Sequence, residues 1–210
     1  FSDPLVECKL CHQRFRADKT DEINDHGKTD HPRLIIDWTV ARQFNLLVKA
    51  YLGIIEGKES EVFLRGEITQ GAFVNFKNIV NSSRVKIPFG IAQIGKAFRN
   101  EITPGNFTYR SREFEQMELE FFIKPNDKEG NKWFEYWKDQ RLKWYLSLGM
   151  KKENLRFRKH KDNERAHYAK SAEDIEFSAP FGWSEFEGIH HRGDWDLSRH
   201  KLAYKDEEGG

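Results

Sequence analysis

Two segments near the middle of this chain could together bind a ligand that carries an anionic group, a flat ring and a cationic group. The first segment ends in Arg99 and Glu101, and the second contains Arg112, Phe114 and Glu118. Alternate side chains of an extended strand point to the same face. If the two strands pair with these faces coincident, the arginines, the aromatic ring and the carboxylates share one open sheet surface.

The two cysteines of the chain form a Cys8-x-x-Cys11 pair. This spacing is half of a zinc knuckle, and zinc in a structural site has four ligands. His12, His26 and His31 are the nearby residues that could complete a Cys2His2 site. The alternative is a pair of reduced thiols that hold no metal.

The composition is that of a polar globular chain whose 210 residues suffice for one domain with a sizeable core. No apolar run approaches the length of a membrane-spanning helix, and no basic stretch followed by an apolar stretch opens the sequence, so nothing in it suggests secretion. Two closely spaced cysteines fit a reducing compartment, so we expect a cytoplasmic protein with no membrane partner. The formal net charge of +1 predicts no strong nonspecific binding to nucleic acid, so any contact with tRNA must come from local patches.

Patterns along the chain predict a mixture of strands and helices. We expect strands at residues 62–67, 86–99, 112–123 and 183–189 and helices at 69–80 and 131–148. Residues 42–51 fit either type of element. The second helix carries a stripe of Trp133, Trp137, Trp144 and Leu148, and Gly149 is expected to end it. Turns or connectors are expected at residues 25–32, 125–130 and 151–164.

Residues 90–122 read GIAQIGKAFRNEITPGNFTYRSREFEQMELEFF and resemble motif 2 of class II aminoacyl-tRNA synthetases, in detail the glycyl-tRNA synthetases of the bacterial dimeric type. Further segments appear in the order of that family: residues 1–18, 42–46, 71–78, 166–170 and 186–200. The resemblance implies an α+β fold, with an antiparallel β-sheet flanked by helices. Residues 1–210 would form a single, partial catalytic domain, with residues 1–32 as a zinc-knuckle-like insertion and 42–46 as a strand.

The implied reaction joins glycine and ATP to glycyl-adenylate and then transfers glycine to the acceptor end of tRNA(Gly), with Mg²⁺ as the metal. Arg99 would bridge the α-phosphate and the substrate carboxylate, and Glu101 would contact the adenine amino group and order the loop. These two are the implied catalytic residues. The implied ATP-binding residues are Arg99, Asn100, Glu101, Tyr109, Arg110, Arg112, Phe114, Glu185 and Phe186. The alternative for Arg99 is a sheet-surface arginine paired with Glu101.

The implied glycine-binding residues are Glu67, Phe114, Glu115, Gln116 and Glu118. Carboxylates accept hydrogen bonds from an ammonium group, and a site without room for a side chain selects glycine by exclusion. Residues 64–71 read Leu-Arg-Gly-Glu-Ile-Thr-Gln-Gly, where the family has Leu-Arg-Pro-Glu-Thr-Ala-Gln-Gly. A glycine loosens a turn that a proline would rigidify, and the alternative for Glu67 is a solvated charge.

The segment around Glu185 and Phe186 is expected on the ATP and metal side of the site, because carboxylate oxygens suit Mg²⁺ bound to a triphosphate. Trp183, Glu185 and Glu187 are expected on one face of this strand, with Phe186 on the other. His190-His191 is expected to be a surface pair. The basic run at residues 151–161 is either a solvated face or a contact for the tRNA acceptor stem.

The resemblance does not decide whether the chain binds zinc. Some members of the family carry a second Cys-x-x-Cys pair before the 42–46 segment, and this chain has none there. The resemblance therefore assigns only Cys8 and Cys11 as metal ligands.

Compared with the family, the chain begins just after the place of motif 1 and ends just before motif 3. A homodimer is typical of the family, but its interface motif is absent from these residues. A second hypothesis is therefore a non-catalytic module that binds ATP or adenylate or a protein partner. A third is an excised or engineered piece of a synthetase.

Overall fold

The computed structural model describes the whole chain except residues 1, 56, 58–59, 163, 202 and 205–210. The chain divides into two compact units. The first comprises Phe1–Ile68 and Gln93–Glu118, and the second comprises Thr69–Ala92 and Leu119–Gly210. The prediction of a single domain stays a prediction, and each unit is described by itself.

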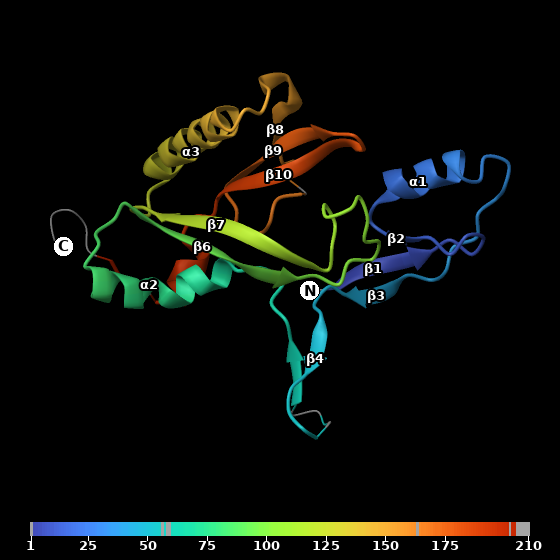
Figure 1. Cartoon of the computed structure of the whole chain (residues 1–210), viewed down its shortest axis with the longest axis horizontal. Helices are drawn as coiled ribbons and strands as arrows, with labels where there is room; N and C mark the ends of the chain where they lie inside the picture. Colours follow the sequence, from blue (N-terminus) through green and yellow to red (C-terminus); the bar gives the residue numbers. More distant parts are fainter. Residues whose placement is uncertain (1, 56, 58–59, 163, 202, 205–210) are drawn as a thin grey trace. The chain divides into compact units, whose positions relative to one another are not determined.

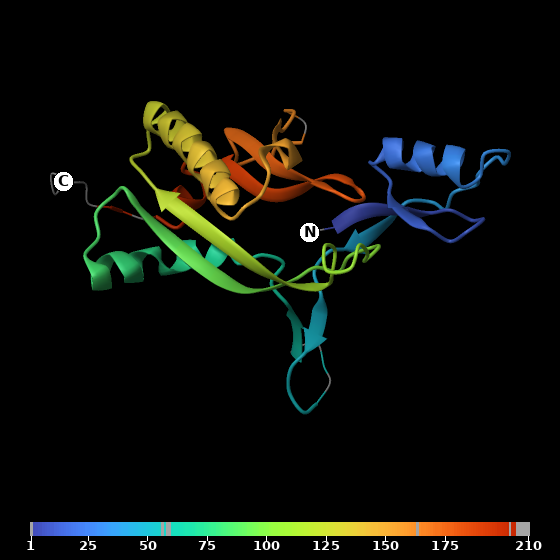
Figure 2. The same cartoon turned by 45° about the horizontal axis from the view of Figure 1, so that its top comes forward.

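The described residues of the first unit form short antiparallel strands and the helix α1 (Figure 1). Its elements are β1 (Ser2–Glu7), β2 (Arg14–Arg16), α1 (Thr20–Thr29), β3 (Arg42–Asn45), β4 (Lys49–Tyr51) and β5 (Glu61–Phe63). β1 is the central strand of an antiparallel sheet of order β2-β1-β3, and β4 pairs with β5. In both views α1 lies on one side of the first sheet (Figures 1 and 2). The strand expected at residues 42–46 is confirmed.

Strands β6 (Phe89–Phe98) and β7 (Glu113–Phe122) pair with each other. Each of them begins in one unit and ends in the other. Exposed and less exposed side chains alternate along both strands, as they do in a sheet with one covered face. The predicted strand pair around the loop at residues 99–112 is confirmed.

The described residues of the second unit form four helices and an antiparallel sheet of order β10-β9-β8. Its elements are α2 (Thr69–Ser83), α3 (Asp127–Ser147), the 3₁₀ helix η2 (Lys152–Asn154), β8 (Leu155–Lys159), β9 (Ser171–Ala179), β10 (Gly182–His191) and α4 (Trp195–Arg199). α3 runs beside this sheet in both views (Figures 1 and 2). Antiparallel sheets with helices beside them confirm the expected α+β class.

Two clusters of buried apolar side chains hold the second unit together. The first joins α3 to the sheet and consists of Phe134, Tyr145, Leu155, Ile175 and Ile189. The second joins α2 to the hairpin formed by β6 and β7 and consists of Phe73, Phe76, Ile87 and Phe122. Burial of each such side chain contributes roughly 1.5–3 kcal/mol relative to an exposed position, so these clusters fix the helices against the strands.

The start of α3 corrects the turn expected at residues 125–130. The side chain of Asn126 accepts hydrogen bonds from the backbone N–H groups of Lys128 and Glu129, which makes Asn126 the N-cap. The helix therefore begins at Asp127 and includes Gly130. Gly149 follows the helix with a φ of +90°, the left-handed conformation that glycine adopts most easily, and this confirms the expected stop.

The helix expected at residues 131–148 is confirmed by α3, but the stripe of tryptophans on it is only partly buried. Trp133 and Trp137 pack on the ring of Phe121, but Trp144 and Leu148 are exposed. The residues of α3 that are buried in the core are Phe134 and Tyr145. The bulky tryptophans thus flank the buried face of the helix.

In the part of the chain that the structure describes, no helix is both long enough and apolar enough to cross a bilayer.

Two expected connectors contain regular structure. Residues 25–32 overlap the second half of α1, which extends to Thr29. Residues 151–164 contain η2 and β8, because Arg156 and Arg158 pair with Glu176 and Asp174 on the neighbouring strand β9. Arg156, Arg158 and His160 of the basic run are therefore engaged with carboxylates of the neighbouring strand β9.

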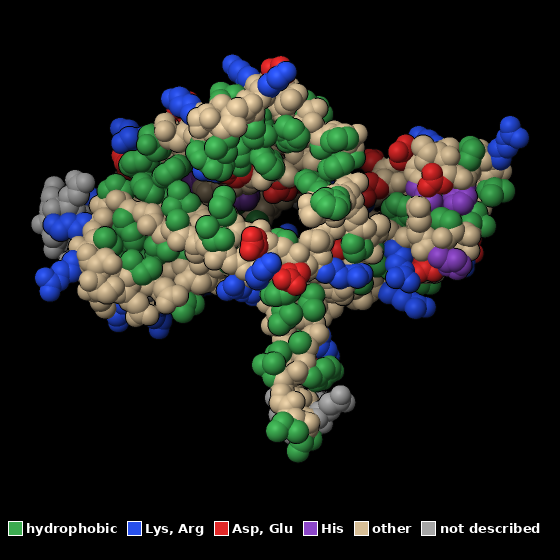
Figure 3. Space-filling view, in the orientation of Figure 1, with side chains coloured by type: hydrophobic (Ala, Val, Ile, Leu, Met, Phe, Trp, Pro, Cys, Tyr) green, Lys and Arg blue, Asp and Glu red, His purple; other side chains and the backbone are tan. Residues whose placement is uncertain are grey.

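The β4–β5 hairpin exposes apolar side chains. Tyr51, Leu52, Ile54, Ile55 and Phe63 are all exposed, and the hairpin at the bottom of Figure 3 is covered with hydrophobic side chains. Its backbone ladder, from Lys49 opposite Phe63 to Tyr51 opposite Glu61, holds the two strands together.

Candidate functional site

Arg99 follows the last residue of β6 and is held by three contacts within the first unit. Its backbone N–H donates to the carbonyl of Arg112 over 2.9 Å. Its side-chain Nε donates to the carbonyl of Gly66 over 2.9 Å. Its guanidinium carbon lies 5.3 Å from the ring centroid of Phe114, a cation–π distance. The structure thus brings Arg99, Phe114 and the segment before Glu67 together, and the two terminal nitrogens of Arg99 lie beyond its anchored Nε.

The loop between β6 and β7 is tied back on itself. Arg110 Nη1 lies 3.2 Å from a carboxylate oxygen of Glu101, and Arg112 Nη2 donates to the Glu101 carbonyl over 3.4 Å. Gly105 and Arg110 form an isolated antiparallel bridge. Three cationic or anionic side chains predicted to contact ATP, Glu101, Arg110 and Arg112, therefore lie together.

The other predicted ATP contacts of this loop lie at its base and its outer part. Asn100 is anchored at the base, because its side-chain amide donates to the Asn45 carbonyl over 3.0 Å. Tyr109 lies in the outer part of the loop and is exposed. A ligand that approaches the loop meets Tyr109 from the solvent side.

Two glutamines fix the segment that carries Glu67. Gln93 on β6 donates through Nε2 to the carbonyl of Ile68 over 2.6 Å. Gln116 on β7 accepts at Oε1 from the backbone N–H of Ile68 over 3.2 Å. Side chains of the two strands therefore point to one common face, as the alternation predicted. Gln116 thus acts on the backbone of the residue next to Glu67.

The residues predicted to bind glycine lie on both faces of the β6–β7 hairpin. Glu118 lies on the same face of β7 as Phe114 and Gln116, because alternate residues of a strand share a face, and all three are half-buried. Glu115 has the opposite parity and is exposed, and one of its carboxylate oxygens lies 3.8 Å from Nζ of Lys96. The structure therefore brings Glu118 to the face with Phe114 but does not bring Glu115 there.

In the second unit, a bulge in β10 separates residues that were expected to share a face. Glu185 lies opposite Glu176, and Glu187 lies opposite Ile175, the next residue on β9. Because consecutive residues of a strand face opposite sides, Glu185 and Glu187 do not share a face, and that expectation is wrong. One extra residue in the bulged strand is enough to cause the change.

Glu187 and Phe186 both contact Tyr145 of α3. Glu187 accepts from the Tyr145 hydroxyl over 2.5 Å and from Arg141 Nε over 2.7 Å, and the Phe186 ring lies 5.1 Å from the Tyr145 ring. Burial and the Glu187 carboxylate raise the pKa of Tyr145, so it stays a hydroxyl donor at neutral pH. Glu185 is exposed, and its predicted role toward ATP and Mg²⁺ stays a prediction.

The pair His190-His191 is more than a surface pair. Ligand atoms of His160, Asp174 and His190 lie within 4.8 Å of one another, on three neighbouring strands or their ends. His191 packs against Gly130 of α3, and burial lowers its pKa. Sequence spacing gave no signal for either contact, because both depend on which strands and helices are neighbours.

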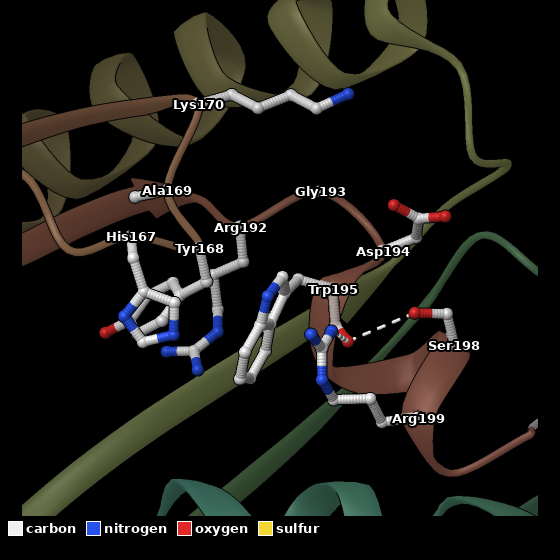
Figure 4. A pocket seen from close by; sticks show the side chains of 10 residues that line it. All are labelled: His167, Tyr168, Ala169, Lys170, Arg192, Gly193, Asp194, Trp195, Ser198 and Arg199. Atoms are coloured by element: carbon white, nitrogen blue, oxygen red, sulfur yellow. Dashed lines mark hydrogen bonds between the residues drawn. The ribbon is translucent and has the colours of Figure 1, made fainter.

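A pocket of the second unit collects two segments that resembled the family (Figure 4). It lies between residues 167–170 and the start of α4, a site that the residue patterns did not indicate. The Arg192 guanidinium lies 3.9 Å from the Tyr168 ring centroid and is paired with Asp196 over 2.8 Å. Beside it, the Arg199 guanidinium lies 3.5 Å from the ring of Trp195. The pocket wall is thus aromatic and cationic.

Comparisons with known proteins agree with the resemblance. The family model described as tRNA synthetase class II core domain (G, H, P, S and T) matches residues 51–210. The glycine–tRNA ligase of Caldanaerobacter subterraneus subsp. tengcongensis is 50% identical over an alignment that covers 95% of this chain and 48% of the relative. For the glycine–tRNA ligase of Geobacillus kaustophilus these values are 48%, 99% and 50%. The chain thus spans about half the length of the curated relatives it matches.

The matched region and the motif 2 hairpin agree on one assignment. The family model covers most of the chain, from the end of β4 onward, and it includes Arg99, Phe114 and the loop between them. The chain therefore belongs to the family of class II tRNA synthetase core domains.

Proposed function

We propose that this chain carries the glycine-activating site of a glycyl-tRNA synthetase. The observation that carries the proposal is the position of Arg99, anchored through Nε on Gly66 and stacked with Phe114. The relatives that are about 50% identical to this chain are named glycine–tRNA ligases, and these names supply the substrate class. The product of the first step is glycyl-adenylate, and the second step transfers glycine to tRNA(Gly).

In the first step a carboxylate oxygen of glycine attacks the α-phosphorus of ATP, and the bond to the β-phosphate oxygen breaks to release pyrophosphate. The terminal nitrogens of Arg99 bridge an α-phosphate oxygen and the glycine carboxylate, which aligns the two reactants and stabilises the charge that develops at phosphorus. Phe114 offers a flat face for the adenine ring. Glu101, held by Arg110, lies at the edge of the same site.

Mg²⁺ bound to the triphosphate would neutralise part of its charge, and exposed carboxylates, such as that of Glu185 in the second unit, are the kind of hard oxygen donor that Mg²⁺ prefers. Mg²⁺ is usually bound by one or two carboxylates together with substrate phosphates and water, so the protein does not have to supply a full set of ligands.

Glycine selectivity follows from the carboxylates beside the hairpin face. Glu67 and Glu118 are both half-buried, and they accept hydrogen bonds from the glycine ammonium group. Gln93 and Gln116 hold the backbone of Ile68, so Glu67 is positioned by two strands at once. A larger amino acid would have to displace this braced segment.

Ligand-induced thermal shifts test whether the two half-sites cooperate. The chain is heated with ATP–Mg²⁺, with glycine, and with both. Any ligand that binds the folded state raises the melting temperature, and we expect the pair to raise it by more than the sum of the separate shifts. Arg99→Ala should abolish the excess, whereas Arg33→Ala, an exposed arginine outside the hairpin, should retain it.

A second candidate function is a module that binds ATP or adenylate without turnover. The observation in its favour is Gly66, where the family element has proline, because a looser turn positions Glu67 less firmly. A shift with ATP–Mg²⁺ that glycine does not increase would support this module and contradict the activating site.

A further inference from the structure

Four metal-ligating side chains converge in the first unit. Sγ of Cys11 lies 3.5 Å from Nε2 of His26, and Sγ of Cys8 lies 3.7 Å from Nε2 of His31. One ligand atom from each of the four residues lies within 4.8 Å of the other three. We propose that these four side chains form a Cys2His2 zinc site.

The spacing of the ligand atoms fits a tetrahedral zinc ion. With Zn–S bonds of about 2.3 Å and Zn–N bonds of about 2.0–2.1 Å, a regular tetrahedron separates sulfur from nitrogen by about 3.6 Å. The two measured S···N distances, 3.5 and 3.7 Å, bracket this value. The same bond lengths place two sulfurs about 3.8 Å apart, and no two of the four ligand atoms lie more than 4.8 Å apart.

His26 is oriented as a metal ligand. Its Nδ1 lies 2.7 Å from a carboxylate oxygen of Asp30, which leaves Nε2 directed at the sulfurs. A carboxylate on the remote ring nitrogen is the usual outer-shell partner of a metal-bound histidine. The rings of Phe15 and Trp38 lie 4.8 and 5.9 Å from the His26 ring, and they shield this side of the cluster from water.

The local fold explains how the two cysteines meet and why His12 is not a ligand. The backbone N–H of His12 donates to the carbonyl of Cys8 over 2.8 Å, and His12 has a φ of +63°, so the chain turns sharply after Cys11. This turn directs the His12 ring outward, where Nδ1 lies 2.9 Å from Glu7. The sequence left His12, His26 and His31 as alternatives, and the geometry selects the last two.

A metal would replace a hydrophobic core in residues 2–32. Among the described residues of this segment, the buried apolar side chains are Val6 and Cys8. So small a core rarely stabilises a segment, and a structural metal is one of the usual substitutes. The two cysteines lie in the segment between β1 and β2, His26 lies on α1 and His31 in the loop after α1, so one ion would cross-link all of these segments. The proposal does not depend on the glycine-activating site.

Metal content of the purified chain is the first test. We expect about one zinc per chain, as for a closed structural site. Cys11→Ser and His31→Ala should lose the metal. His12→Ala is the matched control, because it removes a neighbouring histidine whose ring points away, and it should keep the full content. A chain that binds zinc equally well after Cys11→Ser and His31→Ala would overturn the proposal.

Cobalt titration of the metal-free, otherwise unchanged chain is the second test, and it does not require any variant to fold. Tetrahedral Co²⁺ bound to two thiolates gives visible d–d bands and a thiolate charge-transfer band, and zinc should displace it. Asp30→Asn should weaken the affinity by roughly 10–100-fold, whereas Asp25→Asn, exposed on the same helix, should leave it unchanged. Absence of the thiolate band in the unsubstituted chain would contradict the site.

Discussion

Arg99 shows how single residues are prepared for chemistry in this molecule. Its Nε donates to the Gly66 carbonyl, and its guanidinium lies over the ring of Phe114. These two contacts restrict the conformations of the side chain. Preorganised donors are effective because little reorganisation is needed as charge develops. Gln93 and Gln116 do the same for the backbone of Ile68. The site thus depends on residues that hold other residues in place.

Gly66→Pro should stabilise the chain. Gly66 does not have a left-handed φ, and an added Cβ would make ordinary contact with Leu47 at 3.4 Å. Proline reduces the freedom of the unfolded chain, and at compatible sites it adds about 0.4–1 kcal/mol to the free energy of unfolding. Urea unfolding measures this, with Gly66→Ala to separate the ring from the added Cβ. A larger loss of stability with proline than with alanine would show that the turn does not accept the ring.

Gln116→Leu should weaken glycine binding more than ATP binding. The variant removes the acceptor of the Ile68 N–H and leaves Gln93 as the remaining brace. An unpaired, part-buried N–H costs roughly 1–3 kcal/mol, and the segment with Glu67 should shift. Separate titrations of glycine and ATP–Mg²⁺ measure the effect, and Gln116→Glu, which keeps an acceptor, should restore the glycine affinity. Equal losses for both ligands would argue against a positioning role.

At the scale of elements, close approaches explain features that residue patterns missed. α3 lies so near the end of β10 that a Cβ on Gly130 would come within 2.2 Å of Nε2 of His191. The bulge in β10 then turns Glu187 toward Tyr145 and Arg141 of the same helix. Together these contacts fix α3 along β10.

Gly130→Ala should destabilise the second unit although alanine favours helices. The methyl group would collide with the His191 ring, and overpacking typically costs about 1–3 kcal/mol. In a His191→Ala background the collision is gone, so Gly130→Ala should become stabilising by about 0.5–1 kcal/mol. Urea unfolding of the four proteins of this cycle measures the change of sign. A destabilising effect of the same size in both backgrounds would contradict the close contact.

At the scale of the whole chain, stability should depend on pH through His191. Burial lowers the pKa of His191, so the folded chain binds this proton less readily than the unfolded chain. The contribution of His191 to the free energy of unfolding is complete above about pH 6.5 and declines as the pH falls toward the lower pKa of the folded state.

Urea midpoints measured from about pH 5 to about pH 7.5 test this dependence. His191→Gln should flatten the decline below pH 6.5, and His200→Gln, at the exposed C-cap of α4, should leave it as it is. If both variants keep the full slope, His191 does not control the pH dependence.

Sequence patterns predicted the motif 2 hairpin well because it depends on strand alternation alone. The period of two predicts Arg99 and Phe114 on one face, and the structure brings them together. The sequence patterns did not predict features that depend on contacts between residues far apart in the sequence. The basic strand β8 is ordered by Asp174 and Glu176 of β9. The bulge in β10 has no local signature.

We propose that Arg99 and the residues that position it activate glycine. Glycine-dependent exchange of labelled pyrophosphate into ATP measures that step alone, without tRNA. We expect exchange that requires glycine, is lost in Arg99→Ala, and persists in Arg33→Ala. Absence of exchange in a chain shown to be folded, or exchange that survives Arg99→Ala, would contradict the claim.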